Sequence, residues 1–311
     1  MTIKVLLQTT IAPEADNWSI ARFSLLAALL RQERDESGQL LFDVTARDRD
    51  PVGQPDALLS NLERSDYDQL WLFAVDRGDG LSEEDCRGIN AFRARGGGLL
   101  VARDHMDLGC SVCGLAEVGA AHHFHTRNVD PTAPAVRDDP YTTAISWPNF
   151  HSGANGDYQQ IETLEPVHAV LRDVSAPNGS IQFLPSHPHE GAVGAPPGAR
   201  ARVIARGRSK VTGARFNIAV AFEADGKEGR AIAQSTFHHF ADYNWDPRSG
   251  APSFADEPPG DAILRHPGAH AAAHRYARNV SLWLAGLPTD RVWPARRRKQ
   301  HIVGHYLGDS T

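Results

Sequence analysis

The sequence predicts an α/β fold in which a mostly parallel sheet carries helices on both faces. In the first hundred residues, short apolar runs alternate with segments whose apolar residues recur at helical spacing. The run DQLWLFAVD at 68–76 is almost continuously apolar, which is typical of a strand buried on both faces. A predicted helix ends at three consecutive glycines, and another apolar run follows at once. This alternation favours parallel strands joined by right-handed crossovers.

The first third of the chain can be assigned element by element. Strands are predicted at 3–8, 41–48, 68–76 and 98–104. Helices are predicted at 18–34, at 56–63 and from residue 83 to the glycines at 96–98. Ser82 is expected to be the N-cap of the third helix, with Asp85 completing an acidic variant of the capping box.

Regular patterns are sparse in the middle of the chain and return near residue 200. Residues 116–200 are rich in Pro, Gly, Asn and His, and they predict a loop-rich insertion. Strands are predicted at 201–207, 215–223 and 229–237, the first two as an antiparallel pair, and a last helix at 269–286. Because no linker divides the chain, we expect one domain over 1–290, followed by a tail at 291–311.

Composition narrows the class of protein. The chain has 311 residues, 41% of them apolar, and a formal net charge of −6, which gives no general attraction for nucleic acid or membranes. The basic run at 295–301 is expected to be a solvated tail. The first residues lack the pattern of a secretory leader, and no apolar run approaches the ~20 residues of a membrane span. We expect a cytoplasmic enzyme with a small-molecule substrate, and a homo-oligomer is an open alternative.

Three blocks of the sequence resemble a known family. They are FRARGGGLLVARDH, the segment from HAVLR to IQFLPSHPHEG, and GRAIAQSTFHHF. Over 1–115 and 200–287 the chain is similar to the ThuA-like (trehalose-utilisation) branch of the class I glutamine amidotransferase-like superfamily. The resemblance implies a flavodoxin-like, doubly wound fold with a polar pocket built by His105 and by His238 or His239. It also implies a role in carbohydrate metabolism.

The chain departs from true glutamine amidotransferases at the nucleophile. Those enzymes place a cysteine on a glycine-rich turn directly after a strand, whereas Asp104 and His105 occupy that position here. Cys110 lies several residues further on, without a Gly-x-Cys-x-Gly turn. In SHPHEG, His189 rather than His187 precedes the glutamate. We therefore do not expect glutamine hydrolysis.

Asp104, His105, His238 and His239 are the predicted catalytic residues. If the strand ends near 105 and 238 are neighbours, these side chains could hold Zn²⁺, Mn²⁺ or Fe²⁺ with one position open for water. Without a metal, the same groups could act as a general acid and base. Because consecutive strand residues point to opposite faces, only one of His238 and His239 would face the pocket.

The loop LPSHPHEGA at 184–192 offers further metal ligands. His187 and His189 alternate on a loop stiffened by two prolines, although a plain surface turn has the same composition. The predicted ligands of the divalent metal are His105, His187, His189 and His238.

Polar residues beside aromatic ones predict substrate binding. The segment WPNFHSGANGDYQ at 147–159 combines hydrogen-bonding side chains with flat apolar faces, which suits a polyhydroxylated ligand as well as a turn-rich loop. The predicted substrate-binding residues in this segment and elsewhere are Thr10, Arg103, Asn149, His151, Asn155, Asp157 and Asn244.

The three cysteines are too few for a disulfide framework, so reduced thiols are expected. Cys110 and Cys113 could form a zinc knuckle with His122 and His125, although the interval before the histidines is short. A small buried side chain explains Cys113 equally well.

These features predict a metal-assisted enzyme that catalyses hydrolysis or proton transfer on a small polar substrate, carbohydrate-like or amide-like. One alternative is a metal-free Cys/His hydrolase that uses Cys110 or Cys113. The other is a non-catalytic module that binds a ligand or partner on a decayed amidotransferase-like scaffold.

Overall fold

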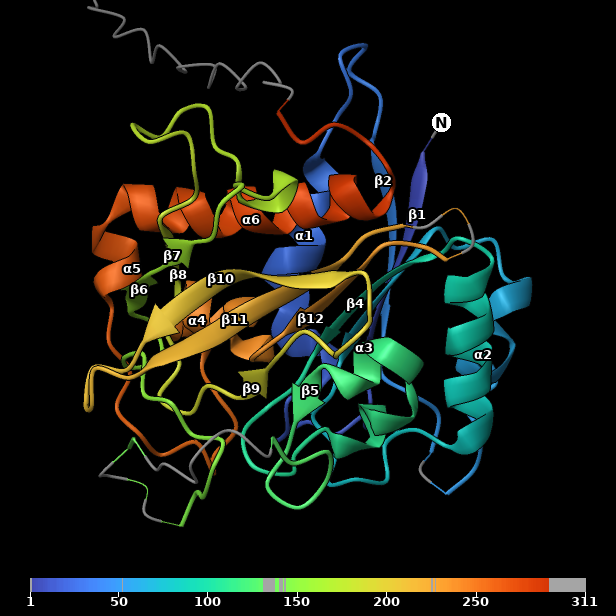
Figure 1. The fold of residues 1–311 in the computed structure, drawn as a ribbon, viewed down its shortest axis with the longest axis horizontal. Helices are drawn as coiled ribbons and strands as arrows, with labels where there is room; N and C mark the ends of the chain where they lie inside the picture. The colour runs from blue at the N-terminus through green and yellow to red at the C-terminus, as the bar shows by residue number, and fades with distance from the viewer. Residues whose placement is uncertain are drawn as a thin grey trace, which may run out of the picture.

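A mixed eight-stranded sheet forms the centre of the protein, in the order β2-β1-β3-β4-β12-β11-β10-β7 (Figure 1). The computed structural model describes residues 2–51, 53–130, 138–139, 142, 144–224, 226 and 228–290. The predicted tail at 291–311, with its basic run, lies outside the described residues. The strands of the sheet are β1 (Ile3–Thr9), β2 (Phe42–Arg47), β3 (Gln69–Phe73), β4 (Gly98–Ala102), β7 (Glu162–Thr163), β10 (Ala201–Arg208), β11 (Arg215–Phe222) and β12 (Ala231–Gln234).

The parallel part of the sheet has the topology of flavodoxin-like folds. Its five strands, β1 to β4 and β12, pair in parallel and follow the spatial order 2-1-3-4-5. In this order the connections diverge at the β1/β3 boundary, which opens a crevice at the carboxyl ends of the strands. The predicted antiparallel pair, β10 and β11, extends the sheet beyond β12.

Helices cover both faces of the sheet, as the sequence predicts (Figure 1). Trp71 and Phe73 of β3 pack into the core that α1 (Ser24–Gln32) and α6 (Pro267–Leu284) close. Leu70 and Leu72 point to the opposite core, which α2 (Glu83–Ala94) closes. The shorter helices are α3 (Ala116–Ala120), α4 (Asp242–Trp245) and α5 (Ala262–Arg265). Among the described residues, no helix is long and apolar enough to cross a membrane.

Several predicted elements are shorter than their apolar patterns. The first predicted helix begins with 3₁₀ turn η1 (Ile20–Phe23), and the second is 3₁₀ helix η2 (Leu59–Arg64). The predicted strand at 229–237 ends at Gln234, and 3₁₀ turn η5 (Phe237–His239) follows. The chain turns there because the Thr236 hydroxyl caps η5 by accepting from the amide of His238.

The insertion at 116–200 contains short elements, in keeping with its weak periodicity. Two small ribbons form within it, β5 with β9 and β6 with β8. Their bounds, with those of the remaining 3₁₀ turns, are β5 (His122–His123), β6 (Tyr158–Gln160), β8 (Phe183–Pro185), β9 (Ala192–Val193), η3 (Cys110–Gly114), η4 (Ala169–Leu171) and η6 (Pro247–Ser249).

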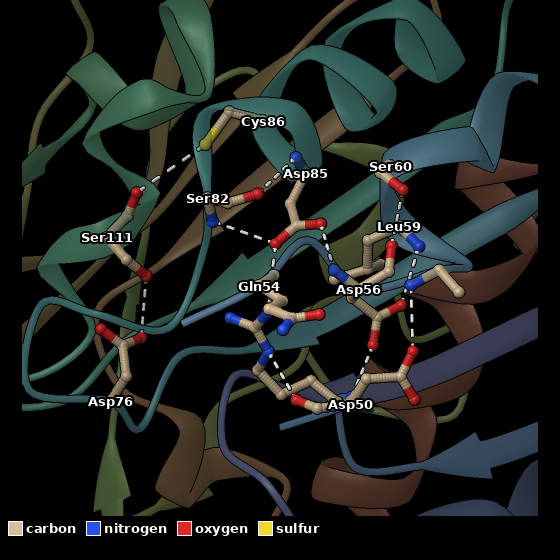
Figure 2. Close-up of polar contacts among 12 residues, drawn as sticks. Asp50, Gln54, Asp56, Leu59, Ser60, Asp76, Ser82, Asp85, Cys86 and Ser111 are labelled. Carbon is tan, nitrogen blue, oxygen red and sulfur yellow. Dashed lines mark hydrogen bonds and ion pairs between the residues drawn. The ribbon is translucent and has the colours of Figure 1, made fainter. Parts of the chain in front are cut away.

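A buried polar network fixes the start of α2 (Figure 2). The predicted capping box is confirmed: Ser82 Oγ accepts from the amide of Asp85, and the Asp85 carboxylate accepts from the amide of Ser82 at 2.9 Å. The same carboxylate accepts from the amide of Asp56 at 2.8 Å and lies 3.4 Å from Arg49. The network therefore anchors the β3–α2 loop, which leads past the crevice.

Candidate metal centre

A cavity of about 980 Å³ opens at the carboxyl ends of the parallel strands. Residues of 11–18 follow β1, residues of 75–79 follow β3, Asp104 and His105 follow β4, and His238 follows β12. Its volume is in the range of small-molecule sites, and its position is the one that parallel α/β sheets use for ligands.

The segments around residues 105 and 238 meet on this cavity. β4 and β12 are parallel neighbours, and Ala102 pairs with Gln234 in the last register position. The chain continues from both strands in the same direction, so His105 and His238 both reach the cavity wall. Two segments 133 residues apart in sequence are therefore side by side in the site.

Asp104, His187 and His238 form a group with the geometry of a metal site. One ligand atom from each of the three lies within 4.8 Å of the others, and all three side chains are buried. The rings of His187 and His238 stack with centroids 3.7 Å apart at an interplanar angle of 15°. Two imidazoles and one carboxylate are a donor set typical of zinc and similar divalent metals.

Hydrogen bonds fix the orientation of both rings. His238 Nδ1 lies 2.8 Å from Asn244 Oδ1, and Asn244 Nδ2 donates to Asn155 Oδ1 and to the Ser186 carbonyl, each at 2.8 Å. Since the amide of Asn244 is held in this orientation, its oxygen accepts from Nδ1, and the Nε2 lone pair of His238 is left for a ligand. His187 Nδ1 lies 3.1 Å from the Thr236 hydroxyl.

Burial keeps the rings of His105, His187 and His238 neutral. It lowers the pKa of His238 to about 4, although Asp104 acts in the opposite direction. Burial, with the neighbouring imidazoles, lowers the pKa of His187 well below its usual value. The pKa of His105 is also lowered, again mainly by burial. Near neutral pH these rings therefore carry lone pairs that can bind a cation or accept a proton.

His105 is the imidazole of the cavity that is least constrained. Its Nε2 lies 3.9 Å from Asp104 Oδ1, and its Nδ1 is buried without a hydrogen-bonding partner among the described residues. Its ring is 5.3 Å from that of His189. This arrangement suits a group that exchanges a proton with a bound molecule.

His189 belongs to a second group, together with Asp139 and Glu257. One ligand atom from each of these three residues again lies within 4.8 Å of the others. His189 Nε2 is 2.9 Å from Glu257 Oε1, and the His187 and His189 ring centroids are 5.6 Å apart. The four predicted metal-binding histidines thus divide: His187 and His238 share one group, His189 is in another, and His105 is in neither.

His239 does not line the cavity, in contrast to its predicted catalytic role. Its Nε2 lies 3.1 Å from Glu190 Oε1, and its Nδ1 lies 2.6 Å from Gln234 Nε2. The hydroxyl of Tyr276 donates to Gln234 Oε1 and extends this buried chain of contacts. Both histidines lie in the turn η5, and of the two only His238 lines the cavity.

Of the seven predicted substrate-binding residues, only Asn155 lines the cavity. Thr10 Oγ1 accepts from the amides of Val75 and Asp76, and Asn149 contacts His189. Arg103 is buried, with its guanidinium 4.0 Å from the Phe124 ring centroid. Asp157, Asn244 and His151 are also away from the cavity wall. Asp157 accepts a hydrogen bond from the amide of Ala262, and Asn244 orients the ring of His238. The carbonyl of His151 accepts from the amide of Lys210.

The cavity wall is acidic. Arg77 is the only arginine or lysine among the described residues that line it. Trp18 and Phe254 add aromatic surface to the wall. The carboxylates along it are Glu14, Asp16, Asp76, Asp79, Asp104, Asp256 and Glu257. Such a surface attracts cations and disfavours anionic ligands.

The thiols lack the properties of a nucleophile. None of the three cysteines lines the cavity. Burial raises the pKa of Cys86 to about 12 and also raises the pKa values of Cys110 and Cys113. Figure 2 shows Cys86 facing the Ser111 carbonyl, with Sγ 4.0 Å from the oxygen. The geometry therefore does not support a metal-free Cys/His hydrolase.

We expect Cys86 to resist alkylation in the native protein. At pH 8 a thiol with this pKa is ionised in on the order of one molecule in ten thousand, and only the thiolate reacts. Mass spectrometry after iodoacetamide treatment should find Cys86 unmodified in buffer and modified in urea. Rapid modification in buffer would contradict this assignment.

The zinc knuckle is not found among the described residues. Cys110, Cys113, His122 and His125 do not bring three ligand atoms together there. Both Cys110 and Cys113 lie in η3, whereas His122 is buried in β5 and His125 Nδ1 lies 3.2 Å from Ser146 Oγ.

Sequence reasoning missed several residues of the site. Thr236, Asp139 and Glu257 contact the histidines. Thr236 lies near the end of the predicted strand at 229–237, and the other two lie in segments without periodicity. Trp18, the first residue of the predicted helix at 18–34, packs edge-on against His238 with a centroid separation of 4.7 Å. For Glu257, the acidic pair at 256–257 was the one signal in the sequence.

No protein-family model matches the chain, and no curated protein matches it in sequence. Solved structures with partial similarity include the mmIFT52 N-terminal domain, at 11% identity, a TM-score of 0.47 and coverage of 78% of this chain and 90% of that one. The Trypanosoma brucei CTPS glutaminase domain has 14% identity and a TM-score of 0.45, with 94% and 97% coverage. The carbohydrate deacetylase Agd3 has 13% identity and a TM-score of 0.37, with 75% and 29% coverage. Similarities of this size assign neither a family nor a function to the chain, and the ThuA-like relationship stays a prediction.

Proposed function

We propose that this chain is a metal-assisted hydrolase of small polar compounds and that Asp104, His187 and His238 hold its metal ion. The observation that carries the proposal is the convergence of three ligand atoms within 4.8 Å on the wall of one cavity. The three residues come from the ends of β4 and β12 and from the 184–192 loop, so folding itself assembles the group.

The donor set fits a divalent metal. Both imidazoles are buried and neutral near pH 7, and the carboxylate gives the group a negative charge that a cation would balance. Asn244 and Thr236 hold the Nδ1 atoms of His238 and His187, in the manner of outer-shell partners that orient metal-binding histidines. When bound, zinc or a similar ion supplies Lewis acidity toward water and a substrate carbonyl.

His105 is proposed to move the proton. Its Nδ1 has no other partner among the described residues, and burial favours the neutral ring. It can accept a proton from the attacking water and return it to the leaving group, so that the ring is regenerated as the ester or amide bond breaks. The neighbouring Asp104 stabilises the imidazolium formed in between.

The residues that line the cavity restrict the charge and the size of the substrate. Its carboxylates disfavour anionic compounds, and its volume suits a molecule of sugar size. The aromatic faces of Trp18 and Phe254 can pack against the CH face of a sugar ring, while Asn155 offers a polar contact. Neutral or cationic acylated sugars are therefore the first compounds to assay.

The metal content of purified protein tests the proposal. Each protein is equilibrated with zinc chloride and freed of unbound ion. The Asp104→Asn and His238→Ala variants should then each retain about one equivalent of zinc per chain less than the wild type. His270→Ala, on α6 and outside the cavity, is the matched control and should behave as the wild type.

Two results would contradict the proposal. A wild type that holds less than about one-tenth equivalent of zinc would exclude a stable metal site. Unchanged binding of an acylated sugar in the His105→Ala, His238→Ala double variant, without turnover in any form of the protein, would favour the non-catalytic binding module.

A further inference from the structure

We propose that the cavity binds a second divalent cation through Asp139, His189 and Glu257, beside the centre formed by Asp104, His187 and His238. This inference builds on the proposed function, because it makes the site a two-metal site. The second group shares no residue with the first, so an experiment can disprove the second cation site without disproving the first.

The second group has the geometry of a cation site. Ligand atoms from the three residues lie within 4.8 Å of one another. Asp139 Oδ2 is 3.3 Å from His189 Nδ1, and Glu257 Oε1 is 2.9 Å from Nε2. His189 and Glu257 line the cavity, whereas Asp139 is buried behind them.

Acceptor oxygens surround the ring of His189. Its two ring nitrogens face three acceptor oxygens, because Asn149 Oδ1 also lies 3.3 Å from Nδ1. The amide of Asn149 is held in this orientation, since its Nδ2 donates to the Ile145 carbonyl. A neutral imidazole has one N–H, so one of its nitrogens would present a lone pair to an acceptor oxygen. A metal ion bound to one of the two nitrogens removes this conflict.

The composition of the group favours a metal ion. A metal ion can bind the imidazole and both carboxylates at once, and the wall of the cavity beside the group is acidic. One imidazole and two carboxylates form a harder ligand set than that of the first centre. Zinc should still enter both sites, because it binds such donors more tightly than manganese does.

The two groups are adjacent. The ring centroids of His187 and His189 are 5.6 Å apart, and Pro188 between them stiffens the segment that carries both. The rings of His105 and His189 are 5.3 Å apart, so the proposed proton-transfer residue contacts both groups. Paired cations on one cavity wall would hold two oxygens of a substrate and its attacking water.

Zinc stoichiometry tests the second site independently of turnover. Each protein is equilibrated with zinc chloride alone, freed of unbound ion and analysed for zinc per chain, with circular dichroism as the check on folding. The wild type should bind about two equivalents, and Glu257→Gln and His189→Gln about one each. Asp256→Asn removes the carboxylate next to Glu257 on the cavity wall, and this variant should still bind about two equivalents of zinc.

The outcomes separate this inference from the proposed function. If the wild type and Glu257→Gln both bind about one equivalent and Asp104→Asn binds none, the second centre is wrong and the first stands. If Asp104→Asn keeps the wild-type content while Glu257→Gln loses zinc, the second centre stands and the first is wrong. A wild type without zinc overturns both.

Discussion

Replacing His105 by alanine is expected to reduce the turnover of an acylated sugar by roughly 10²- to 10⁴-fold, the range typical of lost general acid–base catalysis. The reason is geometric: His105 lines the cavity with an unpartnered, buried Nδ1, next to Asp104, but it belongs to neither ligand group. The variant should therefore lose rate and keep its zinc. The measurement is kcat/KM for hydrolysis together with zinc content, on the same preparation.

His270→Ala and His105→Gln are the controls for this experiment. The first removes an imidazole outside the cavity and should leave both rate and zinc unchanged. The second keeps a polar side chain of similar length but cannot act as a base near neutral pH, so its rate should resemble that of the alanine variant. Wild-type turnover in His105→Ala would assign the proton transfer to another group.

Removing the Glu190 carboxylate is expected to cost about 3–5 kcal/mol of unfolding free energy, because breaking a buried charged network leaves its partners unsatisfied. Glu190 is fully buried and lies between four side chains. Ser152 and Ser235 donate to it at 2.9 and 2.8 Å, Gln159 donates as well, and His239 Nε2 lies 3.1 Å away. Urea denaturation of Glu190→Ala measures the loss.

Glu162 of β7 is the matched control for Glu190. Its carboxylate pairs with Arg215 at 3.3 Å, but both side chains are about half exposed. Glu162→Ala should change the unfolding free energy by less than about 1 kcal/mol, since exposed ion pairs contribute little. If Glu190→Ala does not fold, Glu190→Gln keeps the volume and should still be clearly less stable than the control. Equal stability of the Glu190 and Glu162 variants would contradict a structural role for this network.

The parallel half of the sheet could be predicted from sequence because burial on both faces leaves a local pattern. LLQ in β1 and LWLF in β3 carry it within a few residues, and the capping box of α2 is equally local. β12 has only four residues, and its apolar pattern extends into η5, where a side-chain cap turns the chain. The spacing of apolar residues does not indicate such a cap, so the end of this strand could not be predicted from it.

The site was predicted in part, for a related reason. Asp104, His187 and His238 stood out because few residue types bind metals and each follows or lies near a strand end. Thr10 and Asn244 also stood out, but they hold the backbone of 75–76 and the ring of His238 instead of facing the cavity. Polar residues that support a site and polar residues that contact a ligand have the same composition. Asp139 and Glu257 were missed because three-dimensional proximity alone brings them to His189.

The position of the cavity at the strand ends has a consequence for how such proteins diversify. Asp104 and His238 are anchored directly by neighbouring strands, whereas residues of 11–18 and of 254–257 belong to connecting segments. Connections tolerate insertions and exchanges that a paired strand does not. Exchanges in these outer segments would therefore change which molecules can enter the cavity and leave the residues at the strand ends in place.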